Sequence, residues 1–478
     1  MRSPPTGIAT KRPRPNEHGW LGRTGTVALT LIRNAAVVAT MDDAAREIPG
    51  GAMAFRDGVI VAVGTTVELA AFARDADTIV EAQGCVITPG LVNTHHHLYQ
   101  SLTRALPGAT EASLFGWLKR LYPVWARYTP DDVFAATQLG LAELALSGCT
   151  ISSDHLYLFP NGVTLDDTIH AAAGIGVRFH ATRGSMSVGE SLGGLPPDSL
   201  VEREDAILAD CIRVIDRFHD AADGAMVRVG VAPCSPFSVS QGLMRDAALL
   251  ARDKGVMLHT HLAEDADDVA FSLERFGCRP GQYAEELGWT GSDVWHAHCV
   301  QLDHAEIDLF ARTRTGVAHC PGSNCRLGSG IAPILAMRDA GVPVGLGVDG
   351  SASNDAANLL GEARQAMLLQ RVSHGAGAMA AREALHIATR GGAEVLGRSD
   401  LGQLRAGFRA DFAIWDMAQP ASTGAWDLVA ALVLAPPHQV RDLFVEGRAV
   451  VRGGELVRIP RHRIIAAAQA SLARLMQE

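Results

Sequence analysis

Short apolar segments rich in β-branched residues recur along the middle of this chain, and helix-prone stretches separate them. Eight such segments lie at residues 85–97, 149–155, 177–183, 227–233, 256–261, 294–298, 317–321 and 342–349. Strands that alternate with helices favour a parallel sheet, because each helical crossover returns the chain to the same edge. Eight repeats of that unit predict an α/β fold, a closed (β/α)8 barrel of the TIM type.

The two ends of the chain indicate a second, smaller domain. Strand-like segments precede the barrel, with Asp57-Gly58 as a two-residue turn, and similar segments follow it, with Glu446-Gly447 as the turn. We therefore expect one small β-sandwich domain built from both ends, followed by an amphipathic helix. The expected boundaries are 1–25 for a disordered tail, 26–87 and 405–460 for the composite β domain, 88–404 for the barrel, and 461–478 for the terminal helix.

Composition limits the partners and the compartment. The net charge is -10, from 42 basic and 52 acidic residues, and the body of the chain has no basic cluster, which argues against a nucleic-acid partner. A small-molecule substrate is favoured. The eight cysteines form no CxxC pair, and no apolar run approaches the length of a membrane span. We expect a cytoplasmic protein that makes no membrane contact, and we also expect a homo-oligomer.

Three consecutive histidines end the first segment, CVITPGLVNTHHHLYQ, at residues 85–100. We interpret this segment as one buried strand. Because side chains alternate across a strand, His95 and His97 share one face and His96 takes the other. Two neighbouring imidazoles are a ligand pair that zinc accepts, so the strand end predicts a metal site.

Further metal-binding side chains end later segments. In HTHLAE, His261 is placed to bind metal and Glu264, on the following loop, to move a proton of a water molecule. His259 shares the face of His261, and we assign it to the barrel interior. Asp349 ends the eighth segment. Three histidines and this aspartate leave a coordination position open, which is typical of a catalytic zinc; iron or another divalent metal is the alternative.

Five motifs together resemble the amidohydrolase superfamily, in the branch that holds aminohydrolases and triazine hydrolases. They are PGLVNTHHH, HTHLAE, HAH at 296–298, HCPGSN at 319–324 and GVDGSASND. The resemblance covers about residues 27–460. It implies that His95, His97, His261 and Asp349 hold one zinc ion and that Glu264 shuttles protons. It also implies that His298 faces the reacting carbon and that Asp349 takes part in the chemistry.

Substrate-binding candidates follow from position and side-chain chemistry. Gln100 comes three residues after His97, and its amide has the donor and acceptor needed to recognise the edge of a guanine-like ring. Trp117, with Tyr122 and Trp125, either covers a planar ring or packs two helices together. Arg183 ends a strand, where it can pair with a carbonyl or an anionic ring.

The stretches NTHHHLYQSLTRA, LFGWLKRLYPVWAR, SSDHLY and CSPFSVS further resemble deaminases of oxidised purines within that branch. The resemblance implies hydrolytic release of ammonia from an 8-oxoguanine-like ring. Members of the superfamily with two metals usually bridge them with a carboxylated lysine late in the fourth barrel strand. The fourth segment here, VRVGVAP, has no lysine, so the resemblance implies one metal. The alternatives are a guanine deaminase and an s-triazine hydrolase that releases an amine or chloride. A non-catalytic scaffold barrel is more remote, because all four ligands are present.

Overall fold

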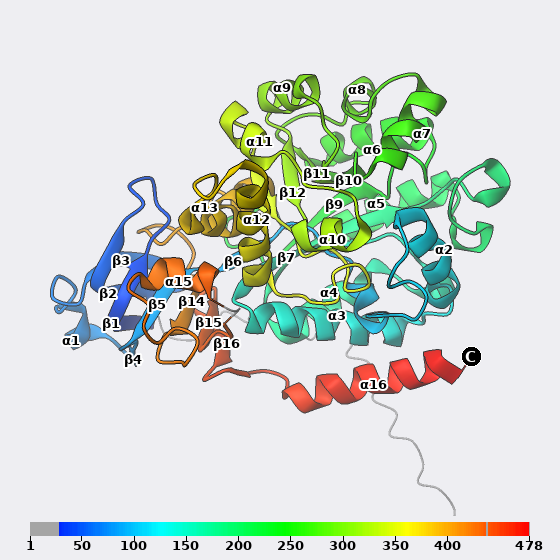
Figure 1. Ribbon diagram of the computed structural model, residues 1–478. Coiled ribbons are helices and arrows are strands. Elements are labelled where there is room, and N and C mark those ends of the chain that lie inside the picture. Colours follow the sequence, from blue (N-terminus) through cyan, green and yellow to red (C-terminus); the bar gives the residue numbers. More distant parts are fainter. Residues whose placement is uncertain (1–27, 436–437, 478) are drawn as a thin grey trace, which may run out of the picture.

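The computed structural model describes residues 28–435 and 438–477, and Figure 1 shows a barrel surrounded by helices beside a smaller sheet. The tail expected at residues 1–25 lies outside the described residues. The barrel is closed, with strand order β6-β7-β8-β9-β10-β11-β12-β13. Its strands are β6 (Leu91–Asn93), β7 (Cys149–Leu156), β8 (Arg178–Ser185), β9 (Val227–Pro233), β10 (Leu258–Leu262), β11 (Val294–His298), β12 (Gly316–His319) and β13 (Val344–Leu346). The predicted α/β barrel is confirmed.

Segments from both ends of the described chain form the second sheet, as expected. Its order is β17-β16-β15-β14-β5-β1-β2-β3, with β4 paired to β1. The strands are β1 (Leu29–Ala39), β2 (Glu47–Arg56), β3 (Val59–Thr65), β4 (Thr78–Glu81), β5 (Cys85–Pro89), β14 (Phe412–Asp416), β15 (Asp442–Val445), β16 (Arg448–Arg452) and β17 (Glu455–Leu456). Both predicted hairpin turns are confirmed, and their residues have the positive φ that such turns require: 49° and 75° at Asp57-Gly58, 53° and 68° at Glu446-Gly447.

The interpretation of residues 85–97 as one strand is wrong, because the segment forms two strands in different sheets. β5 belongs to the smaller sheet and β6 to the barrel. Pro89 lacks the N–H that would continue the ladder. At Gly90 the chain passes close to β7, where a Cβ atom would lie 2.2 Å from the Thr150 side chain. The three histidines therefore follow a short barrel strand, and the chain changes sheet just before the site.

Helices cover the outside of the barrel (Figure 1). They are α2 (Leu114–Trp125), α3 (Pro130–Leu146), α4 (Leu165–Ile175), α5 (Glu204–Phe218), α6 (Gln241–Lys254), α7 (Ala266–Phe276), α8 (Pro280–Glu286), α9 (His304–Thr313), α10 (Pro321–Leu327), α11 (Ile334–Ala340), α12 (Leu359–His374), α13 (Ala381–His386) and α14 (Gly392–Val395). Two further helices, α1 (Phe72–Asp75) and α15 (Leu428–Leu434), accompany the smaller sheet. Thr129 with Asp132, and Thr164 with Asp167, form capping boxes that start α3 and α4.

The last helix, α16 (Arg461–Gln477), packs along α3 through Ile464, Ala468 and Leu475, which are buried at helical spacing. In the described part of the chain, no helix has both the length and the apolar character needed to cross a membrane.

A buried arginine joins the barrel to the smaller sheet. Arg178 begins β8, and its fully buried guanidinium donates to both carboxylate oxygens of Asp411, at 2.7 and 2.8 Å. It also contacts Glu446 and donates to the carbonyl of Gly224 at 2.6 Å. The carboxylates come from the segment before β14 and the turn after β15. A buried guanidinium is stable only beside its carboxylate partners, because removing a carboxylate leaves the positive charge buried without a neutralising neighbour.

We predict that Asp411→Ala lowers the free energy of unfolding by about 3 to 5 kcal/mol, because it leaves the Arg178 charge buried and partly unpaired. Urea denaturation followed by tryptophan fluorescence measures the change. Asp216→Ala is the matched control, since it removes the carboxylate of an ion pair with Lys254 in which Asp216 is 57% exposed. The control should change stability by less than about 1 kcal/mol. Equal effects from the two variants would contradict a structural role for the buried pair.

Candidate metal centre and active site

Four side chains predicted as metal ligands meet at the carboxyl ends of the barrel strands. His95 and His97 follow β6, His261 lies in β10, and Asp349 follows β13; all four are buried. Nε2 of His97 lies 3.0 Å from Nε2 of His261, and Oδ1 of Asp349 lies 3.3 Å from Nε2 of both His95 and His97. The barrel thus brings together residues separated by more than 160 positions.

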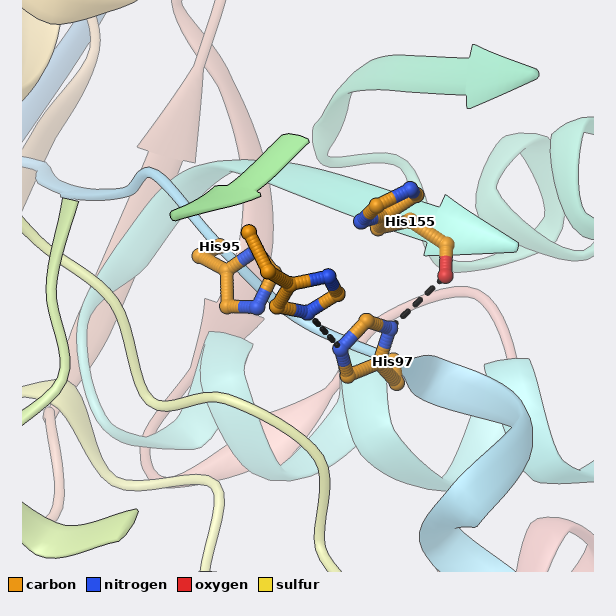
Figure 2. Close-up of side chains that lie close together, drawn as sticks. His95, His97 and His155 are labelled. Atoms are coloured by element: carbon orange, nitrogen blue, oxygen red, sulfur yellow. Dashed lines mark hydrogen bonds between the residues drawn. The ribbon is translucent and has the colours of Figure 1, made fainter. Parts of the chain in front are cut away.

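Backbone carbonyls fix the protonation of two of these rings. Nδ1 of His97 lies 2.7 Å from the carbonyl of His155, and Nδ1 of His261 lies 2.6 Å from that of Cys234 (Figure 2 shows the first contact). A carbonyl only accepts, so each Nδ1 carries the proton and each Nε2 presents a lone pair. Two lone pairs 3.0 Å apart in a buried site repel each other unless a cation lies beside them. The residues present therefore fit a divalent metal ion.

The sequence reasoning missed His155. Its ring stacks on that of His261, with centroids 4.9 Å apart, and its Nδ1 is buried without a hydrogen-bond partner. Two groups of side chains have ligand atoms close enough to share a metal: His95, His97, His155 and His261, and His95, His298 and Asp349. His155 lies in β7, one residue from its end, so the strand-end argument used for the other histidines would have found it.

Asp349 is held as a carboxylate by its neighbours. The backbone of Asp349 adopts a left-handed φ of 61°. Its Oδ1 accepts a hydrogen bond from the backbone N–H of Gly350 at 2.7 Å, and its Oδ2 accepts one from the hydroxyl of Ser353 at 3.1 Å. Burial alone would raise the pKa of this carboxyl group. The adjacent imidazoles of His95, His298 and His97 instead hold its pKa well below the usual range. The ionised form of a carboxyl group is the one that binds a metal, so Asp349 is suited to complete the ligand set.

Glu264 lies close to the same groups as Asp349, but its pKa is shifted in the opposite direction. Its Oε2 is 3.5 Å from Nε2 of His298, and its backbone N–H donates to Asp268 at 3.1 Å. Burial, followed by the negative charges of Asp349, Asp265 and Asp268, raises the pKa of Glu264 well above its usual range. A carboxyl group with a raised pKa is suited to accept and return a proton at neutral pH.

His298 lies between the two carboxyl groups. It ends β11 with a left-handed φ of 72°, and its Nδ1 accepts the amide N–H of Asn324 at 3.0 Å. The proton is therefore on Nε2, which lies 3.5 Å from Glu264 and 3.9 Å from Asp349. Burial lowers the pKa of His298 to about 4, so the ring is neutral and donates one N–H toward the two carboxyl groups.

A cavity opens over these groups, and Gln100 and Trp117 both line it. Gln100 is buried; its Nε2 donates to the hydroxyl of Tyr99 at 3.3 Å, and its Oε1 has no hydrogen-bond partner. The indole N–H of Trp117 donates to the carbonyl of Ala352 at 3.0 Å. Leu114, Leu118 and Phe237 form the apolar part of the wall. The cavity wall thus combines polar groups with aromatic and aliphatic side chains.

The structure does not bring Arg183 to this cavity. Its guanidinium donates to Glu202 at 2.8 and 3.0 Å and to Asp210 at 2.8 Å, and it stacks on Phe159 at 3.7 Å. The charge is already neutralised by these two acidic residues. Tyr122 and Trp125 are also absent from the cavity wall and pack in the core, which was the alternative for these aromatic residues.

Comparison with known proteins agrees with this geometry. The amidohydrolase family matches residues 86–450, which is most of the chain. The protein belongs to the amidohydrolase family. It is 46% identical over 425 residues to the 8-oxoguanine deaminase of Pseudomonas aeruginosa, covering 86% of this chain and 94% of that one. It is also 39% identical over 451 residues to an isoxanthopterin deaminase from an unknown prokaryotic organism, covering 88% and 92%.

A solved amidohydrolase, the atrazine chlorohydrolase of Arthrobacter aurescens TC1 complexed with zinc, superposes with a TM-score of 0.89. It is 34% identical, over 93% of this chain and 100% of that one. The amidohydrolase assignment and these relatives make the protein a hydrolytic enzyme of the deaminase type, with a site that fits a divalent metal.

We predict that purified protein contains about one divalent ion per chain and that His261→Ala loses it, because one of the converging lone pairs disappears. Elemental analysis by mass spectrometry measures the content. His170→Ala is the control, since His170 lies on α4 outside both histidine groups. Two ions per chain, or full retention in His261→Ala, would show that the ligand set is different.

Proposed function

We propose that this protein is a zinc-dependent deaminase that hydrolyses 8-oxoguanine to uric acid and ammonia. The observation that carries the proposal is the pair of carboxyl groups beside His298: Glu264, with a raised pKa, and Asp349, with a lowered one. Two carboxyl groups held in opposite states can divide the work of accepting and donating protons. The 46% identity to an 8-oxoguanine deaminase supports the choice of ring.

His95, His97, His261 and Asp349 would hold the zinc ion. When bound, zinc supplies a Lewis acid that makes a water molecule acidic near neutral pH. Glu264 takes one proton from the water that attacks C2 of the ring, and it delivers this proton to the adjacent ring nitrogen. Asp349 takes the second proton and passes it to the amino group, which leaves as ammonia. The water oxygen remains on C2 as the new carbonyl, so atoms and charges balance.

Ring recognition depends on Gln100 and on the apolar residues of the cavity wall. The unpartnered Oε1 of Gln100 needs a hydrogen-bond donor, and the N1–H of a guanine-like ring supplies one. Nε2 of Gln100 uses one of its two N–H donors on the hydroxyl of Tyr99, which leaves Oε1 and the second N–H of the amide for the ring. The faces of Trp117 and Phe237 provide apolar surface for a flat heterocycle. 8-Oxoguanine and isoxanthopterin both carry an amino group on a ring carbon that lies between two ring nitrogens. The same hydrolytic attack on that carbon would release ammonia from either ring.

The fold similarity to a zinc-containing atrazine chlorohydrolase gives a second candidate, hydrolysis of a substituted s-triazine. A direct comparison of substrates separates the two. We expect ammonia release from 8-oxoguanine, with uric acid as the second product, to be faster than from guanine or isoxanthopterin. Release of amine or chloride from a triazine, with no turnover of these fused rings, would overturn the choice of ring and leave the amidohydrolase assignment intact.

The free state of all eight cysteines fits a reducing compartment, and we propose the cytoplasm. A small heterocycle as partner and a homo-oligomeric assembly are part of the same proposal.

Glu264→Gln should keep the metal and lower kcat by on the order of 10² or more, because the amide has the same shape but cannot accept a proton. Stopped assays of uric acid formation measure kcat, and elemental analysis checks the metal. Glu274→Gln is the control, since Glu274 is an exposed residue on α7. Unchanged turnover in Glu264→Gln would remove this residue from the mechanism.

Gln100→Ala should lower kcat/KM for 8-oxoguanine by about 5- to 150-fold, since it removes one buried hydrogen bond worth roughly 1 to 3 kcal/mol. The metal content should stay the same, because Gln100 is not among the metal-binding groups. Gln282→Ala, at an exposed glutamine paired with Glu286, is the control. If kcat/KM is unaffected in Gln100→Ala, the ring does not bind against this amide.

A further inference from the structure

His259 has no role in the site described so far, yet it is fully buried beside it. It lies in β10, two residues before His261, and belongs to neither histidine group that could share a metal. Its ring stacks on the indole of Trp295, with centroids 4.4 Å apart and planes inclined by 17°. Both of its ring nitrogens have a partner within 3.0 Å, which fixes the ring in position and in rotation.

The two partners determine which nitrogen carries each proton. Nδ1 of His259 lies 2.9 Å from the carbonyl of Trp295, so it donates, and Nε2 of the neutral ring presents a lone pair. Nε2 lies 2.8 Å from Nδ1 of His95, so His95 must donate there. The proton of His95 is then on Nδ1, and its Nε2 presents a lone pair 3.3 Å from Oδ1 of Asp349.

We propose that His259 is a positioning residue for the metal, acting through His95. His97 and His261 are oriented directly by backbone carbonyls, at 2.7 and 2.6 Å. The acceptor behind His95 is instead the imidazole of His259. The carbonyl of Trp295 holds this imidazole in position, and the imidazole in turn orients the ring of His95. The inference rests on the proposed metal site and is independent of which ring the enzyme deaminates.

Trp295 closes the arrangement from the other side. Its indole N–H donates to the carbonyl of Thr94 at 3.0 Å, immediately before His95 in the chain. Trp295 therefore holds the backbone next to the ligand and, through its own carbonyl and its ring face, the histidine that orients the ligand. Contacts of this kind behind a metal-binding histidine set its tautomer and its direction, and their loss typically weakens metal binding 10- to 100-fold.

The test is a measurement of zinc affinity by competition with a chromophoric chelator, which does not depend on turnover. His259→Leu should raise the dissociation constant for zinc by about 10- to 100-fold, because Nδ1 of His95 loses its acceptor. Excess zinc should restore most of kcat, because His259 does not touch the reacting atoms. His259→Gln supplies an amide oxygen that can accept from His95, so it should recover a large part of the affinity.

His180→Leu is the matched control. His180 is equally buried and packs against Trp295 with centroids 5.2 Å apart, but it lies outside both histidine groups. The dissociation constant of the His180→Leu variant for zinc should stay within about twofold of the parent value, because His180 orients no metal ligand. Unchanged affinity in His259→Leu would overturn the proposal. So would equal losses in the leucine and glutamine variants, or an equal loss in His180→Leu, since each outcome points to packing rather than to a hydrogen bond. A wrong choice of substrate would leave all of these affinities as predicted.

Discussion

The site depends on the direction in which three imidazole rings point. A parallel barrel brings strand ends together, but it does not decide which nitrogen of a histidine faces the centre. Here an acceptor behind each ring takes the Nδ1 proton: the carbonyl of His155 for His97, that of Cys234 for His261, and the imidazole of His259 for His95. Three Nε2 lone pairs and an ionised carboxylate then converge in a buried volume, and this accumulation of electron pairs is stable only with a cation.

The same convergence separates the two carboxyl groups electrostatically. Asp349 lies next to the imidazoles of His95, His298 and His97, and their effect on its pKa outweighs that of its burial. Glu264, which is equally buried, has Asp349 and two further acidic residues as its charged neighbours, so burial and repulsion add. His298 spans them with a single N–H, fixed on Nε2 by Asn324. Glu264 and Asp349 therefore differ in pKa because they occupy different positions around the same cluster of histidines. A hydrolytic deamination needs such a pair, since one group must donate a proton and another must accept one.

Much of this was predictable from residue types at strand ends. The eight apolar segments define the barrel; the polar residues that end them include all four predicted ligands and His298, and Glu264 lies on the loop that follows one of them. What failed depends on local geometry that sequence periodicity does not carry. Residues 85–97 look like one strand, because an apolar run continues across Pro89-Gly90, yet the chain changes sheet there. The sequence predicts that Arg183 ends a strand, but β8 continues to Ser185, and acidic residues of the following segments, Glu202 and Asp210, already bind its guanidinium.

The turn after β13 carries Asp349 and packs against Gln100, so it contacts two polar groups of the cavity wall at once. Gly350 follows Asp349, and a Cβ atom at this position would lie 1.8 Å from Oε1 of Gln100. A side chain at residue 350 would therefore push the amide away from the carboxylate. Ser353, three residues on, binds the other oxygen of Asp349 at 3.1 Å. The turn after β13 thus fixes the distance between the Gln100 amide and the Asp349 carboxylate, the two groups to which the proposed function assigns ring recognition and proton transfer. Trp117 is tied to the same turn, because its indole N–H donates to the carbonyl of Ala352 at 3.0 Å. Changes of substrate are therefore easier to accommodate at the other apolar residues of the cavity wall, Leu114, Leu118 and Phe237.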